Sequence, residues 1–337
     1  MKKIGFLSFG HYRDVPGARV RTGRDSLRQS VELAVAAEQA GLDGAWFRVH
    51  HFEQSLGAPT ALLAAAGART STIDLGTGVV DMRYENPLAL AENIASADLI
   101  SQGRVQLGVS RGSPEAAVDG QAAFGLDKQP GERWDDVARA RAERFRQAVS
   151  GAPMARSQRA GALGGPADLP VEPQSPGLAE RIWWGAATVA TGEWAAREGY
   201  HLLSSTLMLG DDGRPFEVQQ AEQLRRYQKR YATSGHTTGG LTAVTRPVFP
   251  ITDDADRRYF GASAEQGDSR GILDDAKAVS GPTIAGPPDR VAELLDADAA
   301  VTEADYVLFA LPSQLGVAYN THLFENLVAL ARDLGWK

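Results

Sequence analysis

The chain has 337 residues, 43% of them hydrophobic and 23% charged, and a formal net charge of −7 at pH 7. This length suits a globular protein with a large core, and the negative charge gives no electrostatic reason to bind nucleic acid or an anionic membrane. The absence of cysteine excludes disulfides and cysteine-bound metals, and no apolar run approaches the roughly 20 residues of a membrane span. We therefore expect a cytoplasmic protein whose function resides in a pocket.

Short apolar runs alternate with helical patterns along the chain. Residues 3–9 predict a first strand, and residues 25–40 predict an amphipathic helix that ends at Gly41. The same alternation then continues toward the C-terminus. The other predicted strands are 44–49, 72–80, 104–109, 181–186, 201–204, 241–251 and 304–311. The other predicted helices are 59–69, 87–101, 134–149, 192–198, 216–233, 288–295 and 317–334.

Short apolar strands between helices are typical of a parallel sheet that is covered on its faces. Eight such units in a single domain of residues 1–337 favour a closed (β/α)8 TIM barrel over an open Rossmann-like sheet with a second domain. Three segments interrupt the alternation: 110–131 after the fourth strand, an irregular insertion at 151–180, and 260–286 after the seventh strand. Because insertions after a strand lie at the active-site face, 260–286 is either a mobile lid or a disordered connection.

Two adjacent histidines, His50 and His51, end the second predicted strand in the run Arg48-Val49-His50-His51-Phe52. Neighbouring residues on a strand point in opposite directions, so one metal ion is not expected to bind both of them. We therefore predict no metal site. A histidine at the carboxyl end of a barrel strand can act as a general acid or base near neutral pH, and the alternative is a structural histidine outside the pocket.

Three further strand ends carry residues that suit a flat, phosphorylated ligand. The run Gly76-Thr77-Gly78-Val79 lacks the third glycine of a dinucleotide fingerprint, but its small residues allow a ligand close to the backbone. Arg111 follows the next strand and can hold a phosphate, or can instead pair with Glu115. Ala187, Thr188 and Thr191 precede the predicted helix 192–198, where they form either an anion cradle or an ordinary N-cap.

Taken in order, these stretches resemble the bacterial luciferase-like flavin-dependent monooxygenase family, of which the alkanal monooxygenase α chain is a member. The resemblance covers residues 1–205 well, and the remainder matches only in its order of strands and helices. One departure is Val49, which stands where the family has the glutamate of its Glu-His-His-Phe run. The stretches that carry the resemblance are Ala36–Trp46, His50–Phe52, Leu75–Val80, Asn86–Glu92, Leu99–Gly108 and Glu193–Gly199.

The resemblance implies a TIM barrel with a non-covalent FMN site. It also implies that the protein forms a homodimer. Arg111 and the turn from Ala187 through Thr188 to Thr191 would hold the phosphate of FMN. Gly78-Val79, where the family often has a non-proline cis peptide, would lie against the flavin ring. His50 would be catalytic. Reduced FMN from a separate NAD(P)H-dependent flavin reductase would react with O2 and a small organic substrate.

Two alternative functions remain open. F420-dependent oxidoreductases share this barrel and transfer a hydride without oxygen, and some relatives of luciferase bind flavin without turnover. The residues of the phosphate site cannot separate FMN from F420, because both cofactors carry a phosphate. A group of large side chains near the strand ends either lines an apolar substrate pocket or belongs to the core: Trp46, Phe47, Phe52 and Met82.

Overall fold

The computed structural model describes residues 2–113, 115, 117–157, 168–263, 267–273 and 275–337. Within these residues, eight parallel strands form a closed barrel, in which each strand pairs with the next barrel strand along the chain and the last closes on the first. The predicted TIM barrel is therefore confirmed, and the open Rossmann-like sheet is excluded. The barrel strands are β1 (Lys3–Ser8), β2 (Gly44–Phe47), β3 (Asp74–Thr77), β5 (Val105–Ser110), β8 (Ile182–Ala186), β9 (His201–Ser204), β11 (Thr242–Arg246) and β16 (Tyr306–Leu311).

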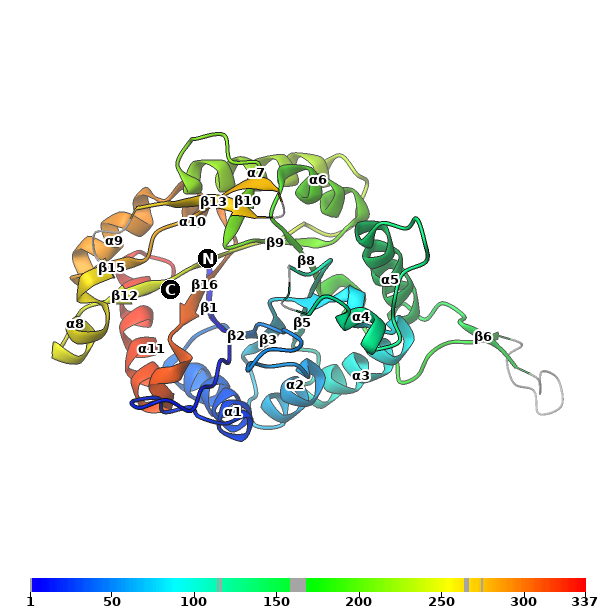
Figure 1. The fold of residues 1–337 in the computed structure, drawn as a ribbon, viewed down its shortest axis with the longest axis horizontal. Coiled ribbons are helices and arrows are strands. Elements are labelled where there is room, and N and C mark those ends of the chain that lie inside the picture. The colour runs from blue at the N-terminus through cyan, green and yellow to red at the C-terminus, as the bar shows by residue number, and fades with distance from the viewer. Residues whose placement is uncertain (1, 114, 116, 158–167, 264–266, 274) are drawn as a thin grey trace.

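Helices surround the barrel in chain order, as the colour sequence in Figure 1 shows. The first of them begins at a capping box, in which Thr22 and Asp25 each accept a backbone N–H of the other, and ends at Gly41 with a left-handed φ of 97°. The helices are α1 (Gly23–Ala40), α2 (Pro59–Gly67), α3 (Pro87–Ile100), α4 (Gly120–Ala123), α5 (Trp134–Val149), α6 (Val189–Glu198), α7 (Phe216–Ala232), α8 (Asp254–Phe260), α9 (Pro288–Ala297), α10 (Ala299–Glu303) and α11 (Gly316–Asp333). No helix in the described ranges is long and apolar enough to cross a membrane.

The hydrophobic core has two main layers, and a third, small cluster consists of Met208, Phe216 and Val279. The larger layer lies between the strands and the helices, and the smaller layer fills the interior of the barrel. Trp46 and Trp183 meet edge to face inside the barrel, with ring centroids 5.4 Å apart. Because this interior is packed, the barrel is not a pore, and a ligand can enter only at one of its ends. The interior residues are Leu7, Trp46, Trp183, Leu203, Ala243, Tyr306 and Leu308.

Two predicted strands are each divided in the structure. Residues 72–80 form β3 and the short β4 (Val80–Asp81), separated by a cis peptide bond between Gly78 and Val79. Residues 241–251 form the barrel strand β11 and then β12 (Val248–Pro250), which pairs with β15 (Ile284–Gly286) outside the barrel. Pro247 separates β11 from β12, since proline has no N–H to donate to a neighbouring strand.

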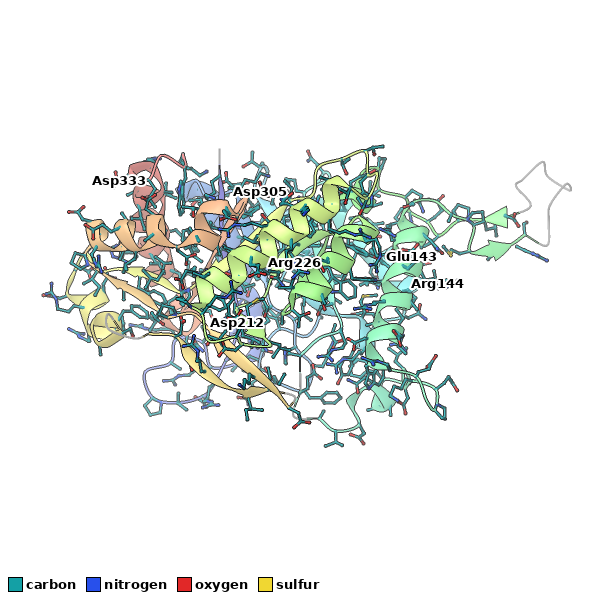
Figure 2. All side chains as sticks on the ribbon, turned by 90° about the horizontal axis from the view of Figure 1, so that it is seen from above. Glu143, Arg144, Asp212, Arg226, Asp305 and Asp333 are labelled. Atoms are coloured by element: carbon teal, nitrogen blue, oxygen red, sulfur yellow. The ribbon has the colours of Figure 1, made fainter. Side chains whose placement is uncertain are left out.

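The insertions occupy different sides of the barrel. The segment 151–180 precedes β8 and contains β6 (Ala155–Arg156) and β7 (Asp168–Leu169), an antiparallel pair that projects away from the barrel in Figures 1 and 2. The segment 260–286 contains a hairpin of β13 (Ser269–Leu273) and β14 (Ala276–Ser280), and β14 also pairs with β10 (Leu207–Leu209) after β9. The second insertion therefore lies near the carboxyl ends of the strands.

Candidate active site

A cavity of about 550 Å³ lies at the carboxyl ends of the barrel strands. Its walls come from β1, β9, β10 and β13 and from the segments that follow β1, β2, β3, β5 and β8. This volume is within the range of small-molecule and cofactor sites, about 300–1,000 Å³. The cavity brings together all the predicted site residues: His50, Gly78, Val79, Arg111, Ala187, Thr188 and Thr191.

One wall of the cavity is formed by the cis peptide of Gly78-Val79, at the position where the family resemblance implies one. A side chain at position 78 would meet the Cδ1 atom of Leu7 at 2.9 Å, which is too close for an unshifted neighbour. The side chain of Val79 packs on the cluster inside the barrel. The wall therefore has no side chain at Gly78, and the side chain of Val79 supports it from the barrel interior. A flat ligand can lie against such a surface.

At the end of the cavity beside β8, the first turn of α6 presents its N-terminus. Thr188 is the N-cap, and its hydroxyl accepts the N–H of Thr191 at 3.1 Å. The helix begins at Val189, so the predicted start at residue 192 is three residues late. Gln223 on α7 fixes this turn by donating to the carbonyl oxygen of Thr188 at 2.8 Å. The N-cap interpretation is thus correct, and it leaves first-turn N–H groups for an anion.

Two arginines line the cavity with this turn. Arg111 lies beside Asp135, with its Nε atom 3.7 Å from a carboxylate oxygen of that residue. Arg139 on α5 places its guanidinium 4.5 Å from the ring centroid of Trp194 on α6. The sequence prediction missed Arg139, because α5 carries several arginines and nothing in their spacing marks the one that reaches the cavity.

His50 lines the same cavity and is 7% exposed. Its Nε2 atom lies 2.6 Å from Nη2 of Arg48 and 3.0 Å from the hydroxyl of Ser113. Its Nδ1 atom lies 3.0 Å from a carboxylate oxygen of Glu53 and 3.8 Å from one of Glu115. Burial, and then the charge of Arg48, lower the pKa of His50 below 6.5 despite the two carboxylates, so the ring is neutral at pH 7.

The second histidine lies outside the cavity. His51 stacks on Tyr84, with ring centroids 4.3 Å apart, and meets Phe124 edge to face. The prediction that the two histidines face different surroundings is confirmed, but strand alternation is not the reason. The strand β2 ends at Phe47, and both histidines belong to the segment after it.

The large side chains proposed for the substrate pocket are not its lining. Trp46 lies inside the barrel, while Phe47 and Met82 belong to the layer beneath the helices. Phe52 is 56% exposed, has a left-handed φ of 55° and does not line the cavity. Apolar side chains of the cavity come instead from the strand ends and the hairpin: Leu7, Phe9, Trp184, Leu203, Leu207, Leu209 and Leu273.

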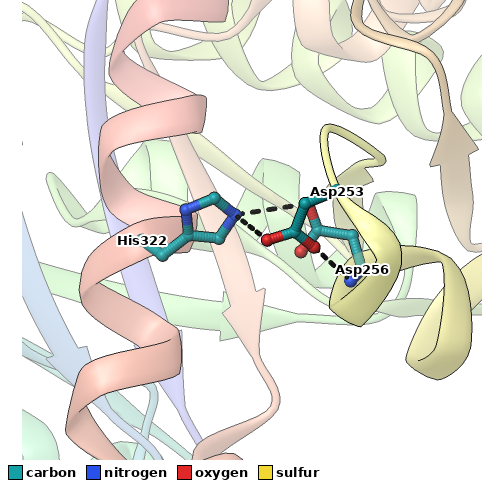
Figure 3. Close-up of side chains that lie close together, drawn as sticks. All are labelled: Asp253, Asp256 and His322. Carbon is teal, nitrogen blue, oxygen red and sulfur yellow. Dashed lines mark hydrogen bonds and ion pairs between the residues drawn. The ribbon is translucent and has the colours of Figure 1, made fainter.

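A separate cluster of possible metal ligands lies between α8 and α11 (Figure 3). The Nε2 atom of His322 lies 3.3 Å from a carboxylate oxygen of Asp256 and 3.7 Å from one of Asp253. The carboxylate of Asp256 already accepts hydrogen bonds from Thr252 and Tyr319, and that of Asp253 caps α8. These contacts account for the cluster as a link between the two helices.

Comparison with curated proteins finds relatives of two kinds. The chain is 37% identical over 90 residues to 4-hydroxyprotoasukamycin monooxygenase of Streptomyces nodosus subsp. asukaensis. This match covers 26% of this chain and 24% of that protein. The chain is 38% identical over 102 residues to F420-dependent glucose-6-phosphate dehydrogenase of Amycolatopsis mediterranei (strain U-32), which covers 28% and 31%. Each match therefore spans about a third or less of the relative.

Comparison with solved structures extends the likeness to the whole fold. The oxygenating constituent of 3,6-diketocamphane monooxygenase from Pseudomonas putida, in complex with FMN, superposes with a TM-score of 0.69 over 97% of both chains. Its sequence identity is 17%, so it supports the fold alone. The model of the luciferase-like monooxygenase family matches residues 4–303. By this match, the chain belongs to the luciferase-like monooxygenase family.

Proposed function

We propose that this protein is an FMN-dependent monooxygenase that acts on a small, largely apolar organic molecule. One observation carries the proposal. A single cavity combines a helix N-terminus and two arginines with His50 and a set of apolar side chains. A flavin mononucleotide has this polarity, because its phosphate is dianionic and its ring is flat and mostly apolar.

The residues present fit FMN. Arg111, Arg139 and the first turn of α6 offer charge-assisted and backbone donors for a phosphate. Gly78-Val79 offers a thin wall for the ring. When bound and reduced, FMN supplies the electrons that activate O2. The leucines and Phe9 exclude water, while His50 holds or accepts a proton on the substrate side of the cavity.

The proposal includes two partners. The family resemblance implies a two-component system, and we propose that a separate NAD(P)H-dependent reductase supplies reduced FMN to this protein as well. We also propose a homodimer, in keeping with the family resemblance. Both can be tested by mixing the protein with a flavin reductase and by measuring its mass in solution.

F420-dependent hydride transfer is the second candidate, because one of the two relatives described above is an F420-dependent dehydrogenase. The third candidate function is that of a flavin-binding protein without turnover. Such a protein would bind FMN but would not consume O2 when substrate is added. Titration with FMN and with F420, followed by oxidation of the bound reduced cofactor with and without O2, separates the three. We expect tight FMN binding, weak F420 binding and oxidation that requires O2.

The phosphate site predicts how Arg111→Ala changes flavin affinity. Loss of a charge-assisted hydrogen bond costs about 1.5–3 kcal/mol, so FMN should bind about 10- to 100-fold more weakly. Riboflavin, which lacks the phosphate, should bind almost as well as it does to the wild type. Fluorescence titration measures both affinities. Arg144→Ala is the matched control, because Arg144 is an exposed arginine on the same helix as Arg139, labelled in Figure 2. Equal losses for FMN and riboflavin would exclude Arg111 from the phosphate site.

A further inference from the structure

The protonation pattern of His50 can be deduced from its neighbours. An arginine side chain has only donors, and it remains charged in proteins. Because Nη2 of Arg48 lies 2.6 Å from Nε2 of His50, that nitrogen must be the acceptor. A neutral imidazole has one ring proton, so the proton of His50 resides on Nδ1. The hydroxyl of Ser113, 3.0 Å from Nε2, can donate to the same lone pair.

The Nδ1 atom is fully buried, and its surroundings are acidic. Its nearest oxygens belong to Glu53 at 3.0 Å and Glu115 at 3.8 Å, although neither is well aligned with the ring N–H. Glu115 is 4% exposed and already accepts the hydroxyl of Tyr84 at 2.5 Å. Glu53 is 34% exposed and also lies 3.7 Å from Arg48. Of the two carboxylates, that of Glu53 is the closer to Nδ1 of His50, and it does not accept the hydroxyl of Tyr84 as that of Glu115 does.

The local chain path explains how Glu53 reaches His50. The N–H of His50 donates to the carbonyl oxygen of Leu56 at 2.9 Å, which closes a short loop after β2. Inside this loop, Phe52 adopts a left-handed φ of 55°, a conformation that reverses the chain. Glu53 is therefore folded back three residues onto the ring. Val49, at the position of the family's glutamate, is buried and contributes no charge.

We propose that Glu53 is the positioning residue of this active site, and that it holds His50 with its proton on Nδ1 and its lone pair on the side of the cavity. The inference rests on the proposed function for its catalytic meaning. Arg48 and Ser113, which flank Nε2, both line the cavity. A proton taken from a bound group would go to Nε2 once Arg48 and Ser113 release their hydrogen bonds to that lone pair, and Glu53 would balance the imidazolium that results. The carboxylate lacking at position 49 is thus supplied from position 53.

The test is histidine imidazole NMR on the flavin-free protein labelled with ¹⁵N-histidine. The chain has six histidines, and the His50 signals are assigned by their loss in His50→Asn. The proposal expects a protonated Nδ1 and an unprotonated Nε2 in the wild type. Glu53→Gln keeps the shape and removes the charge, so it should lower the pKa of His50 by about one unit. Arg48→Met should raise that pKa and allow protonation of Nε2.

Glu325→Gln is the matched control, because it removes the same charge from an exposed residue of α11. Glu115→Gln should affect His50 less than Glu53→Gln, since Glu115 is farther from Nδ1. A wild-type proton on Nε2, or a Glu53→Gln spectrum identical to that of the control, would overturn the proposal. These signals do not depend on flavin. A protein that shows them but fails to bind FMN would retain the inference about Glu53 and lose the proposed function.

Discussion

At the scale of single residues, the strongest prediction concerns His50, which lines the cavity and belongs to a different segment from Arg111 and Arg139. Loss of a general acid–base group typically costs 100- to 10,000-fold in rate, so His50→Ala should lower kcat by about 100-fold or more. FMN affinity should change little. Oxygen consumption with reduced FMN and substrate measures turnover, and fluorescence titration measures binding.

The matched control for that prediction is the neighbouring histidine. His51 packs on Tyr84 and Phe124 and does not line the cavity, so His51→Gln should retain most of the turnover. Two variants with equally reduced kcat would mean that His50 acts through the packing of this loop. Unchanged turnover in His50→Ala would remove the residue from the mechanism.

At the scale of elements, the prediction concerns the hairpin of β13 and β14, which contributes to the cavity wall. Leu273 at the end of β13 lines the cavity, while Ile272 beside it is 78% exposed. If the hairpin is a lid, FMN binding should slow amide hydrogen exchange in Ser269–Leu273 and Ala276–Ser280, whereas β6 and β7 on the projecting arm should not respond. Mass spectrometry of the exchanged peptides measures both. Exchange that is unaffected by FMN would make the hairpin a fixed cover.

At the scale of the whole molecule, acid stability depends on a histidine at the start of β9. His201 packs on Trp183 inside the barrel, and its Nδ1 atom accepts the N–H of Leu241 at 3.1 Å. Burial lowers the pKa of His201 from 6.5 to about 4. The unfolded chain therefore takes up this proton first as the pH falls.

The sign of this effect follows directly. The contribution of His201 to stability is complete above pH 6.5 and is lost as the pH falls to about 4. The loss in the free energy of unfolding amounts to about 3 kcal/mol. Urea unfolding at several pH values should give a steeper decline for the wild type than for His201→Gln. Parallel curves for the two proteins would contradict this assignment.

The order of strands and helices could be predicted from sequence because it depends on local properties. Apolar runs, helical periodicity and end signals such as Gly41 act within about one turn or one strand. Almost every helix and strand predicted from them is present in the structure. The predicted site residues could be placed for a related reason. In a barrel of parallel strands, residues that follow different strands meet at the same end, so Gly78, Arg111 and Thr188 were expected to share a cavity, and they do.

The partners of each side chain were decided by the tertiary structure. Trp46 and Phe47 are adjacent and equally apolar, yet one lies inside the barrel and the other beneath the helices, because barrel closure determines which face of the strand is interior. Arg139 reaches the cavity only because α5 packs beside α6. The run Arg48-Val49-His50-His51-Phe52 by itself predicted that a histidine would follow the second barrel strand. Only the folded chain, by turning back at Phe52, brings the charge of Glu53 within 3.0 Å of that histidine.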